Sequence, residues 1–382
     1  MSAPAAAPGS REDAAQAREK AGELLRLARV RGARQLLHRP RASRHPADIL
    51  RAIAGAQAQE PPSGRLAVRS RHPTLTAADI ERARTEERSV IRLWAMRNTA
   101  HLIATEDLPF IRPLFAPLME SFNRRRLAHF GIEPSAQDRV LELISEELER
   151  HGPLTRTELS ERIERAGISV DPQVRAHVFP LAVSTRIACL GAGDGGATEL
   201  VAAGDWLADD PPDLEREGAL AELARRYFAA FGPASEADFA GWAGLPLGDV
   251  RAAMKSIAAE LREVSVLGAP AWQPRGRAPR PIEAGLVRLL PAFDTYLMGH
   301  RERRHIAPAA RWAQIGPGGG ILHPAITCGG RAIGTWRLRR RAGKLESELL
   351  PFGDLDAATA RAVDAELGDV ARFEGRPSGR AS

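Results

Sequence analysis

An internal repeat constrains the fold of this chain more than any other feature of its sequence. Residues 152–159 and 232–239 share the pattern Gly-Pro-x-(Thr/Ser)-x-x-(Glu/Asp)-(Leu/Phe), and the two copies begin 80 residues apart. In each copy a hydroxyl residue precedes an acidic residue by three positions, which is the signature of a capping box at the start of a helix. A unit that recurs in this way indicates tandem copies of one supersecondary structure, here a helix-turn-helix.

Helical and strand patterns surround both copies. A long helix is expected before each copy and a second helix after each. Downstream of the first copy, residues 186–190 and 198–201 are predicted to form strands on either side of the glycine-rich turn 191–196. Helices followed by a hairpin give the order of elements in a winged helix. The helices are expected at 136–150 and 213–230 before the copies, and at 172–184 and 247–261 after them.

Helices followed by a hairpin are also predicted in the first third of the chain. The third of these helices begins at a capping box formed by Thr76 and Asp79. After it, two apolar runs flank the polar triplet Arg97-Asn98-Thr99, which is typical of a β-hairpin. The helices are expected at 22–30, from Pro46 to about Glu60 and at 77–86, and the strands at 90–96 and 100–103.

Three prolines follow this hairpin at four-residue spacing. Pro109, Pro113 and Pro117 all lie within residues 105–120. Proline removes a backbone donor and clashes with the preceding turn of a helix, so a single straight helix is predicted to be ruled out for this stretch.

The last third of the chain is predicted to be richer in strands. Residues 287–294 are expected to form a strand that ends at an acid, and residues 321–327 and 331–339 to pair across the turn Cys328-Gly329-Gly330. Arginines gather at the far end of this second hairpin. A closing helix is expected at 356–373.

Together these patterns predict an α+β fold that is mostly helical, with tandem winged-helix (helix-turn-helix) domains whose wings are β-hairpins. At 382 residues the chain is long enough for two or three domains. The expected order is a disordered lead-in, three winged helices, of which the third carries the C-terminal hairpin region, and a frayed tail. Their expected boundaries are 1–19, 20–130, 131–210, 211–374 and 375–382.

Two glutamines mark the end of the second predicted helix. The apolar stripe of this helix continues to Gln57, so a primary amide lies where the pattern asks for an apolar side chain. Pro61 disfavours a helical conformation at the residue before it, which ends the helix near Glu60 and leaves Gln59 on the exit turn. Both amides can instead cap the helix or satisfy buried backbone groups, and a Gln-x-Gln motif alone does not decide against this.

The charge balance mildly favours a polyanionic partner such as nucleic acid. The chain carries 54 basic and 48 acidic residues, a net charge of +6. Only three of the basic residues are lysines, and the planar guanidinium of arginine suits bidentate contacts with phosphate. Cys189 and Cys328 with scattered histidines give no metal-binding spacing, so neither a metal nor another cofactor is expected. The sequence shows no signal peptide or membrane-spanning run, and a reducing cytoplasm is the expected location.

Four stretches of the chain, taken in order, resemble the AlkZ-like family of winged-helix DNA glycosylases, bacterial proteins built from tandem winged helices that excise alkylated bases. The matches span nearly the whole folded chain rather than a single motif. They are Gln57–Pro62, Arg97–Ile103, Leu289–Tyr296 and Gly334–Trp336.

The signature of this family is Gln, an apolar residue, and then Gln or Asp, which this chain matches at Gln57, Ala58 and Gln59. The resemblance implies that Gln57 and Gln59 are the catalytic pair and that duplex DNA containing alkylated purines is the substrate, bound by a monomer. It also implies a role in DNA repair or self-resistance, because the Gln-x-Gln branch is associated with bulky purine adducts, interstrand crosslinks and resistance to DNA-alkylating natural products.

Amide side chains suit a restricted form of glycosidic hydrolysis. An amide has no useful pKa and cannot act as an ordinary general base. A purine alkylated at N7 or N3 already carries a positive charge, however, and leaves as a neutral base without protonation. The remaining task is to orient a water against the anomeric carbon while oxocarbenium character develops, which an amide carbonyl can do. Cationic adducts should therefore be excised, and neutral lesions such as uracil should not.

Further side chains are candidates for DNA contacts, each with a structural alternative. The arginine groups at 300–305 and 337–341 can grip phosphates or form solvated faces. A histidine in the first hairpin, an acid at a strand end and the tryptophans can touch DNA, or can serve packing, capping and ion pairs. The predicted DNA contacts are Arg97, His101, Asp294, Arg301, Arg303, Arg304, Trp336, Arg337 and Arg339.

Two other functions fit the same pattern. Winged helices usually occur in DNA-binding transcriptional regulators, and a fold alone does not fix a function. A regulator typically has one such unit with a ligand-binding or dimerisation domain, whereas the resemblance here extends far beyond one unit. A lesion-binding protein without catalysis is the second alternative, and the sequence does not separate it from an enzyme.

Overall fold

The computed structural model consists of helices and small sheets in which most strand pairs are antiparallel. No helix in the part of the chain that it describes is long and apolar enough to cross a membrane, and no group of three potential metal ligands occurs there. The described residues are 11–40, 45–193, 197–207, 211–341, 344–376 and 378–380.

The first part of the chain folds as helices followed by a hairpin, as predicted. The capping box of α4 (Ala77–Thr85) is present, since the Asp79 N–H donates to Thr76 Oγ1 over 3.2 Å and the Thr76 N–H donates to Asp79 Oδ2 over 2.8 Å. Strands β2 (Val90–Trp94) and β3 (Ala100–Ala104) pair over their full length. Before them come α1 (Arg11–Arg34), α2 (Pro46–Ala52) and α3 (Pro61–Arg69).

The helix predicted to reach the double glutamine ends earlier, and Gln57 lies in a strand. After α2, Ala54 and Gly55 have φ values of +59° and +85°, and these left-handed conformations reverse the chain. Strand β1 (Ala56–Gln57) then pairs with β3, so that Gln57 stands opposite His101. The prediction was wrong because it continued the helical period past a turn that a glycine makes possible.

A single helix, α5 (Leu108–His129), contains the three prolines that were expected to rule out a single straight helix. Pro109 lies in its first turn, where a missing backbone donor costs nothing. Pro113 cannot donate to the carbonyl of Pro109, and the N–H of Leu214 donates to that oxygen instead, over 2.8 Å. The helix continues through the prolines because a distant segment satisfies a group that proline leaves unpaired.

Both copies of the internal repeat begin a helix with a capping box, as predicted. The hydroxyls of Thr155 and Ser235 accept the N–H groups of Glu158 and Asp238 over 3.2 and 3.1 Å, and these acids accept the N–H groups of the two capping residues in return. The first copy belongs to α6 (Pro134–His151), β4 (Leu154–Thr155), α7 (Arg156–Arg165), α8 (Pro172–Ser184), β5 (Ala188–Leu190), β6 (Glu199–Ala202) and α9 (Ala203–Trp206), and the second to α10 (Arg216–Phe231), α11 (Glu236–Ala243) and α12 (Leu247–Ser256).

A hairpin after the second copy was missed by the sequence analysis. Strands β7 (Leu261–Val266) and β8 (Ala269–Pro274) pair across Leu267 and Gly268, whose φ values are +53° and +80°. A two-residue turn with positive φ at both positions matches the twist of an antiparallel pair. The helix predicted for 247–261 therefore ends at Ser256, and its last predicted residue begins β7.

The last third of the chain forms a five-stranded sheet and the predicted closing helix, α15 (Ala357–Glu374). The predicted hairpin across Cys328-Gly329-Gly330 is present. In spatial order the strands are β13 (Ser378–Arg380), β12 (Lys344–Pro351), β11 (Arg331–Arg341), β10 (Ala325–Cys328) and β9 (Val287–Leu290), and the short helices α13 (Thr295–Met298) and α14 (Ala309–Ile315) lie between β9 and β10 in the chain.

The two ends of the chain are more ordered than predicted. Helix α1 begins inside the lead-in that was expected to be disordered, so residues 11–19 are helical, while residues 1–10 lie outside the described residues. In the tail 375–382, which was expected to be frayed, Ser378–Arg380 form a strand parallel to β12. Pairing with the sheet supplies these backbone groups with partners that a sequence pattern does not show.

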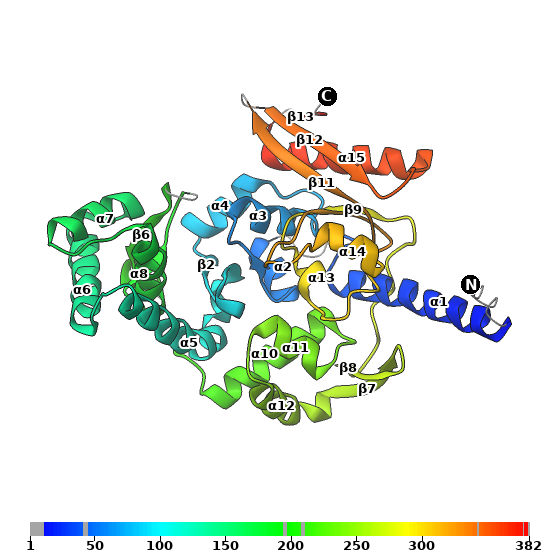
Figure 1. The fold of residues 1–382 in the computed structure, drawn as a ribbon, viewed down its shortest axis with the longest axis horizontal. Helices are drawn as coiled ribbons and strands as arrows, with labels where there is room; N and C mark the ends of the chain where they lie inside the picture. The colour runs from blue at the N-terminus through cyan, green and yellow to red at the C-terminus, as the bar shows by residue number, and fades with distance from the viewer. Residues whose placement is uncertain are drawn as a thin grey trace, which may run out of the picture.

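The hydrophobic cores cross the domain boundaries expected from the sequence. One core joins the first helices and hairpin with the C-terminal sheet and α15, as when Ile53 and Leu102 share it with Leu289 and Phe373. Another joins the first hairpin and α5 with α10, α11 and α12. Figure 1 shows α2 and α3 beside the C-terminal elements, α10 to α12 as a separate group, and α6 to α8 at the far end, connected through α5. The first and last thirds of the chain therefore fold together.

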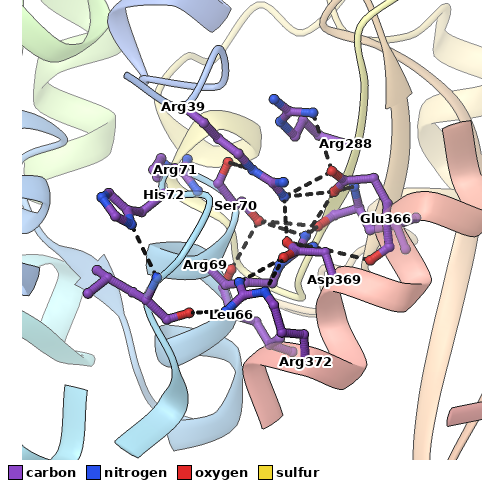
Figure 2. Close-up of polar contacts among 12 residues, drawn as sticks. Arg39, Leu66, Arg69, Ser70, Arg71, His72, Arg288, Glu366, Asp369 and Arg372 are labelled. Atoms are coloured by element: carbon purple, nitrogen blue, oxygen red, sulfur yellow. Dashed lines mark hydrogen bonds and ion pairs between the residues drawn. The ribbon is translucent and has the colours of Figure 1, made fainter. Parts of the chain in front are cut away.

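Buried ion pairs fasten α3 to the C-terminal sheet and α15. Arg69, at the end of α3 and fully buried, donates to the Leu289 carbonyl over 2.6 Å and contacts the carboxylates of Glu366 and Asp369 at 3.2 and 3.1 Å. Glu366 is itself buried and accepts the backbone N–H of Leu289 over 3.2 Å. Figure 2 shows further arginines that converge on the same two carboxylates, namely Arg39, Arg288 and Arg372.

Replacing Glu366 with Gln should destabilise the protein strongly. The change leaves Arg69 buried without one of its two carboxylates, and breaking a buried ion pair in this way costs about 3 kcal/mol. Urea unfolding of the variant and the wild type measures the loss. The matched control is Glu142→Gln, which removes a solvent-exposed pair with Arg139 and should leave the unfolding midpoint unchanged. Equal midpoints for the two variants would contradict the role given to the buried cluster.

Candidate active site

Gln57 lies in the first three-stranded sheet, where the guanidinium of Arg97 binds its side-chain oxygen. Only 6% of its surface is exposed, and its Oε1 accepts a hydrogen bond from Arg97 Nη2 over 3.0 Å. Nη1 of the same arginine donates to the carbonyl of Trp242 in α11. Burial, followed by the nearby charge of Arg303, lowers the pKa of Arg97 to about 10, so the guanidinium stays protonated near neutral pH. The amide of Gln57 is thus fixed through its oxygen.

Gln59, by contrast, is exposed directly after β1. Its Oε1 accepts the backbone N–H of Ala100 over 3.0 Å. Ala58 between the glutamines is fully buried, and Gly64 of α3 packs directly against it. The two residues are so close that a Cβ added to Gly64 would lie only 2.7 Å from the Ala58 Cβ. Small residues at both positions therefore bring the start of α3 against the double glutamine. A carbonyl oxygen accepts two hydrogen bonds, so each glutamine oxygen retains an acceptor position.

A groove of about 930 Å³ opens at Gln59. One wall is the start of α3, and the other is formed by β11 and by the segments 291–293 and 321–324. Arg337 and Arg339 are both exposed on β11, as expected for alternate residues of a strand. A separate cavity of about 220 Å³ between β2, α5 and β5 is mainly apolar and contains neither glutamine. The groove is therefore the place where a candidate catalytic residue meets two predicted phosphate contacts.

A family model described as DNA glycosylase AlkZ-like matches residues 50–373. The chain belongs to the AlkZ-like DNA glycosylase family. It therefore acts on DNA as a glycosylase. Among solved structures it is similar to DNA glycosylase AlkZ of Streptomyces sahachiroi, with a TM-score of 0.75 and 24% sequence identity over 94% of this chain and 99% of that chain. No curated protein matches the chain.

Asp294 was predicted to contact DNA, but the glycosylase buries it completely. Its two oxygens accept hydrogen bonds from Arg71 Nη1 and Nη2 over 2.6 and 2.7 Å, and Oδ1 also accepts the N–H of Tyr296 over 2.9 Å. Arg71 follows α3, so this ion pair ties the end of α3 to the turn before Asp294. Phe293 in that turn has a φ of +57° and lines the groove with Gln59. Asp294 therefore shapes the groove without reaching it.

His101 and Trp336, also predicted to contact DNA, are buried, although Trp336 belongs to the lining of the groove, and DNA contact by either stays a prediction. Only 2% of His101 and 1% of Trp336 is exposed. The Trp336 Nε1–H donates to the carbonyl of Leu290 over 2.8 Å, within the core shared by the first and last thirds of the chain. His101 Nδ1 bonds the Thr99 carbonyl over 2.8 Å. Burial, followed by the charge of Arg97, lowers the pKa of His101 to about 3, so the ring is neutral at physiological pH.

The arginines predicted at 301–304 lie outside the groove at Gln59. Arg301 and Arg304 are exposed, and Arg304 forms an ion pair with Glu302 at 2.6 Å. Arg303 is half-buried, with its guanidinium carbon 4.7 Å from the ring centroid of Trp312. Exposed ion pairs contribute little to stability, and Arg337 in the groove forms one with Glu348 as well, so DNA binding by this group stays a prediction. The side chains of Arg340 and Arg341, in the other predicted group, lie outside the part of the structure that is described.

Sequence analysis missed several side chains that line the groove. Glu60 is exposed directly after Gln59, where its carboxylate adds negative charge to the same wall. Phe293 lies within a stretch that carried the family resemblance, but the strand pattern gave no sign of its exposure. Ile321 and His323 were predicted to lie in the strand 321–327, but β10 begins only at Ala325, and both residues line the groove with Gln59 from the loop before that strand.

The depressed pKa of His101 makes the stability of this glycosylase depend on pH. In the unfolded chain His101 binds a proton near pH 6.5, whereas in the folded chain it does so only near pH 3. Its stabilising contribution is complete above pH 6.5 and is lost as the pH falls toward 3, by about 2 kcal/mol between pH 7 and pH 5. Unfolding free energies of the wild type and His101→Gln, measured at each pH, should show the wild type losing this amount relative to the variant. A difference that stays constant would contradict the lowered pKa.

Proposed function

We propose that this glycosylase hydrolyses the N-glycosidic bond of cationic alkylated purines in duplex DNA, as a monofunctional enzyme without a metal. The substrates are N7-alkylguanine and N3-alkyladenine. The observation that carries the proposal is the placement of the two amides, with Gln57 fixed by Arg97 and Gln59 exposed in a groove whose far wall carries Arg337 and Arg339. Arginines on that wall can neutralise phosphates on either side of the lesion.

The two glutamines act on water and sugar rather than on the base. The alkylated base leaves as a neutral molecule, so no side chain has to protonate it. The open acceptor position of the Gln59 carbonyl receives a hydrogen bond from the attacking water and holds it against the anomeric carbon. The C–N bond breaks as the new C–O bond forms, its electron pair neutralises the departing base, and the proton of the water passes to solvent. The fixed dipole of Gln57, whose oxygen is oriented by Arg97, and the carboxylate of Glu60 favour the positive charge that develops on the sugar.

The architecture supports binding along a duplex. Three groups of helices each end in a hairpin, formed by β2 and β3, by β5 and β6, and by β7 and β8, which is the order of elements in tandem winged helices. We extend the proposed substrates to bulky purine adducts and interstrand crosslinks, because the groove is open and its lining includes many apolar side chains. The proposed role of the enzyme is DNA repair or self-resistance to a DNA-alkylating natural product. Binding as a monomer is part of the same proposal.

Removing either amide should abolish excision and leave DNA binding intact. Wild type, Gln57→Ala and Gln59→Ala are incubated under single-turnover conditions with a duplex carrying one N7-methylguanine, and release is scored as strand scission at the abasic site. Each variant is expected to lose about 100-fold or more in rate, the usual cost of losing transition-state positioning. The Kd for a duplex with an abasic-site analogue should not change. Gln173→Ala, exposed at the start of α8, is the matched control.

Two outcomes of this experiment would count against the proposal. Excision by both variants at the rate of wild type would remove the glutamines from the mechanism. No release by wild type from this substrate or from a bulkier N7 adduct, together with tight binding to one undamaged sequence, would favour a transcriptional regulator instead. Membership of a glycosylase family disfavours that alternative.

Arg337 and Arg339 should supply part of the electrostatic affinity for DNA. Replacing both with Ala is expected to reduce the slope of log K against log salt by about 2, since each phosphate contact contributes close to 1. Fluorescence anisotropy with a labelled duplex over a range of salt concentrations measures the slope. The double variant Arg139→Ala/Arg150→Ala, both exposed on α6, controls for the loss of two surface charges. An unchanged slope for the groove variant would show that these arginines do not contact phosphates.

A further inference from the structure

A glycine-rich loop presents an unshielded isoleucine at the edge of the groove. Ile321 is 53% exposed, the highest value for a large apolar side chain among the described residues. The loop joins α14 to β10, and Ile321 lines the groove that contains Gln59. Exposed apolar side chains are common on protein surfaces and usually need no explanation. Ile321 differs from a residue such as Leu118, which is 46% exposed on α5, because it lines the same groove as Gln59.

The backbone of the loop holds this side chain outward. Gly318, Gly319 and Gly320 have φ values of +105°, +61° and +77°, which residues with a Cβ rarely adopt. A Cβ at any of the three would meet no atom within 4 Å, so the conformation of the backbone, and not lack of space, explains the glycines. The loop is nonetheless anchored, because the Ile321 N–H donates to the Gly318 carbonyl over 3.1 Å and the next residue, Leu322, is buried in the core beneath.

The charges around the groove identify the kind of molecule that this isoleucine meets. The exposed Arg337 and Arg339 line the same groove, and half-buried Phe293 adds a second apolar surface. An exposed isoleucine side chain close to arginines is complementary to a partner with phosphates on its outside and stacked aromatic rings on its inside. Duplex DNA has this arrangement, and proteins that unstack a base step do so with side chains such as Ile, Leu and Phe.

We propose that Ile321 is a wedge that inserts between stacked bases beside the alkylated purine and opens the duplex against Gln59. The inference rests on the proposed function. It assigns to Ile321 the step that exposes the glycosidic bond, so that the water held at Gln59 can reach it. The bare backbone of Gly318–Gly320 lets the sugar–phosphate chain approach the loop closely while the isoleucine enters the stack.

Fluorescence of 2-aminopurine tests the wedge independently of excision. The full-length protein is mixed with a duplex in which 2-aminopurine flanks an abasic-site analogue, and fluorescence rises when the base unstacks. Ile321→Ser is expected to lose at least about half of the rise seen with wild type, with a change in Kd below about threefold, since phosphate contacts remain. Its melting temperature should not change, because the side chain is exposed. Ile321→Met should restore the signal, and Leu118→Ser should behave as wild type.

Excision kinetics separate this inference from the proposed function. On N7-methylguanine DNA, Ile321→Ser should lower the single-turnover excision constant by about tenfold, and Ile321→Met should restore it. If Ile321→Ser unstacks and excises as wild type does, the wedge is overturned while the proposed function stands. If wild type excises nothing but unstacks 2-aminopurine in a manner that requires Ile321, the proposed function fails and the wedge stands.

Discussion

Two buried arginines at the end of α3 determine how the first and last thirds of this protein come together. Arg69 and Arg71 are both fully buried, and their carboxylate partners, Glu366, Asp369 and Asp294, all come from the last third of the chain. A buried charge without a partner is strongly destabilising, so the end of α3 requires the C-terminal sheet and α15 in order to fold. Helix α3 begins at Pro61, shortly after the double glutamine, so the candidate catalytic pair lies just before its first turn and the ion pairs lie at its other end (Figures 1 and 2). These pairs, with the hydrophobic core around them, join the segments from the first and last thirds of the chain that line the groove at Gln59.

Sequence patterns predicted the elements whose signals lie within a few residues. The capping boxes at Thr76, Thr155 and Ser235 are all present, since each depends on an acid three positions away. Errors arose where a distant segment completes the local structure. Asp294 was read as an accessible acid because its partner, Arg71, lies 223 residues away in the chain. The resemblance to a known family identified the two glutamines. The helical stripe predicted the wrong conformation for Gln57, because its pairing with β3 depends on residues more than 40 positions further on. The groove could not be predicted, because its walls come from four separate stretches of the chain.

The site contains a fixed amide and an exposed one, and this difference suggests a division of labour. Gln57 is buried, with its oxygen engaged by Arg97, so its dipole has one orientation. Gln59 faces the groove, where a water can reach its carbonyl. His101 stands opposite Gln57 in the sheet, but its lowered pKa keeps the ring neutral, so it cannot serve as a general acid at physiological pH. The proposed reaction therefore needs a substrate that already carries the positive charge which an enzyme would otherwise create by protonating the base.

Excision from a matched pair of duplexes tests this claim most directly. One duplex carries N7-methylguanine and the other 7-methyl-7-deazaguanine, which has the same shape and the same bond to the sugar but no positive charge. We expect single-turnover release of the first base and no release of the second, although both duplexes bind with similar Kd. Release of both bases at comparable rates would mean that the protein protonates its leaving group, and it would contradict a mechanism that relies on two amides.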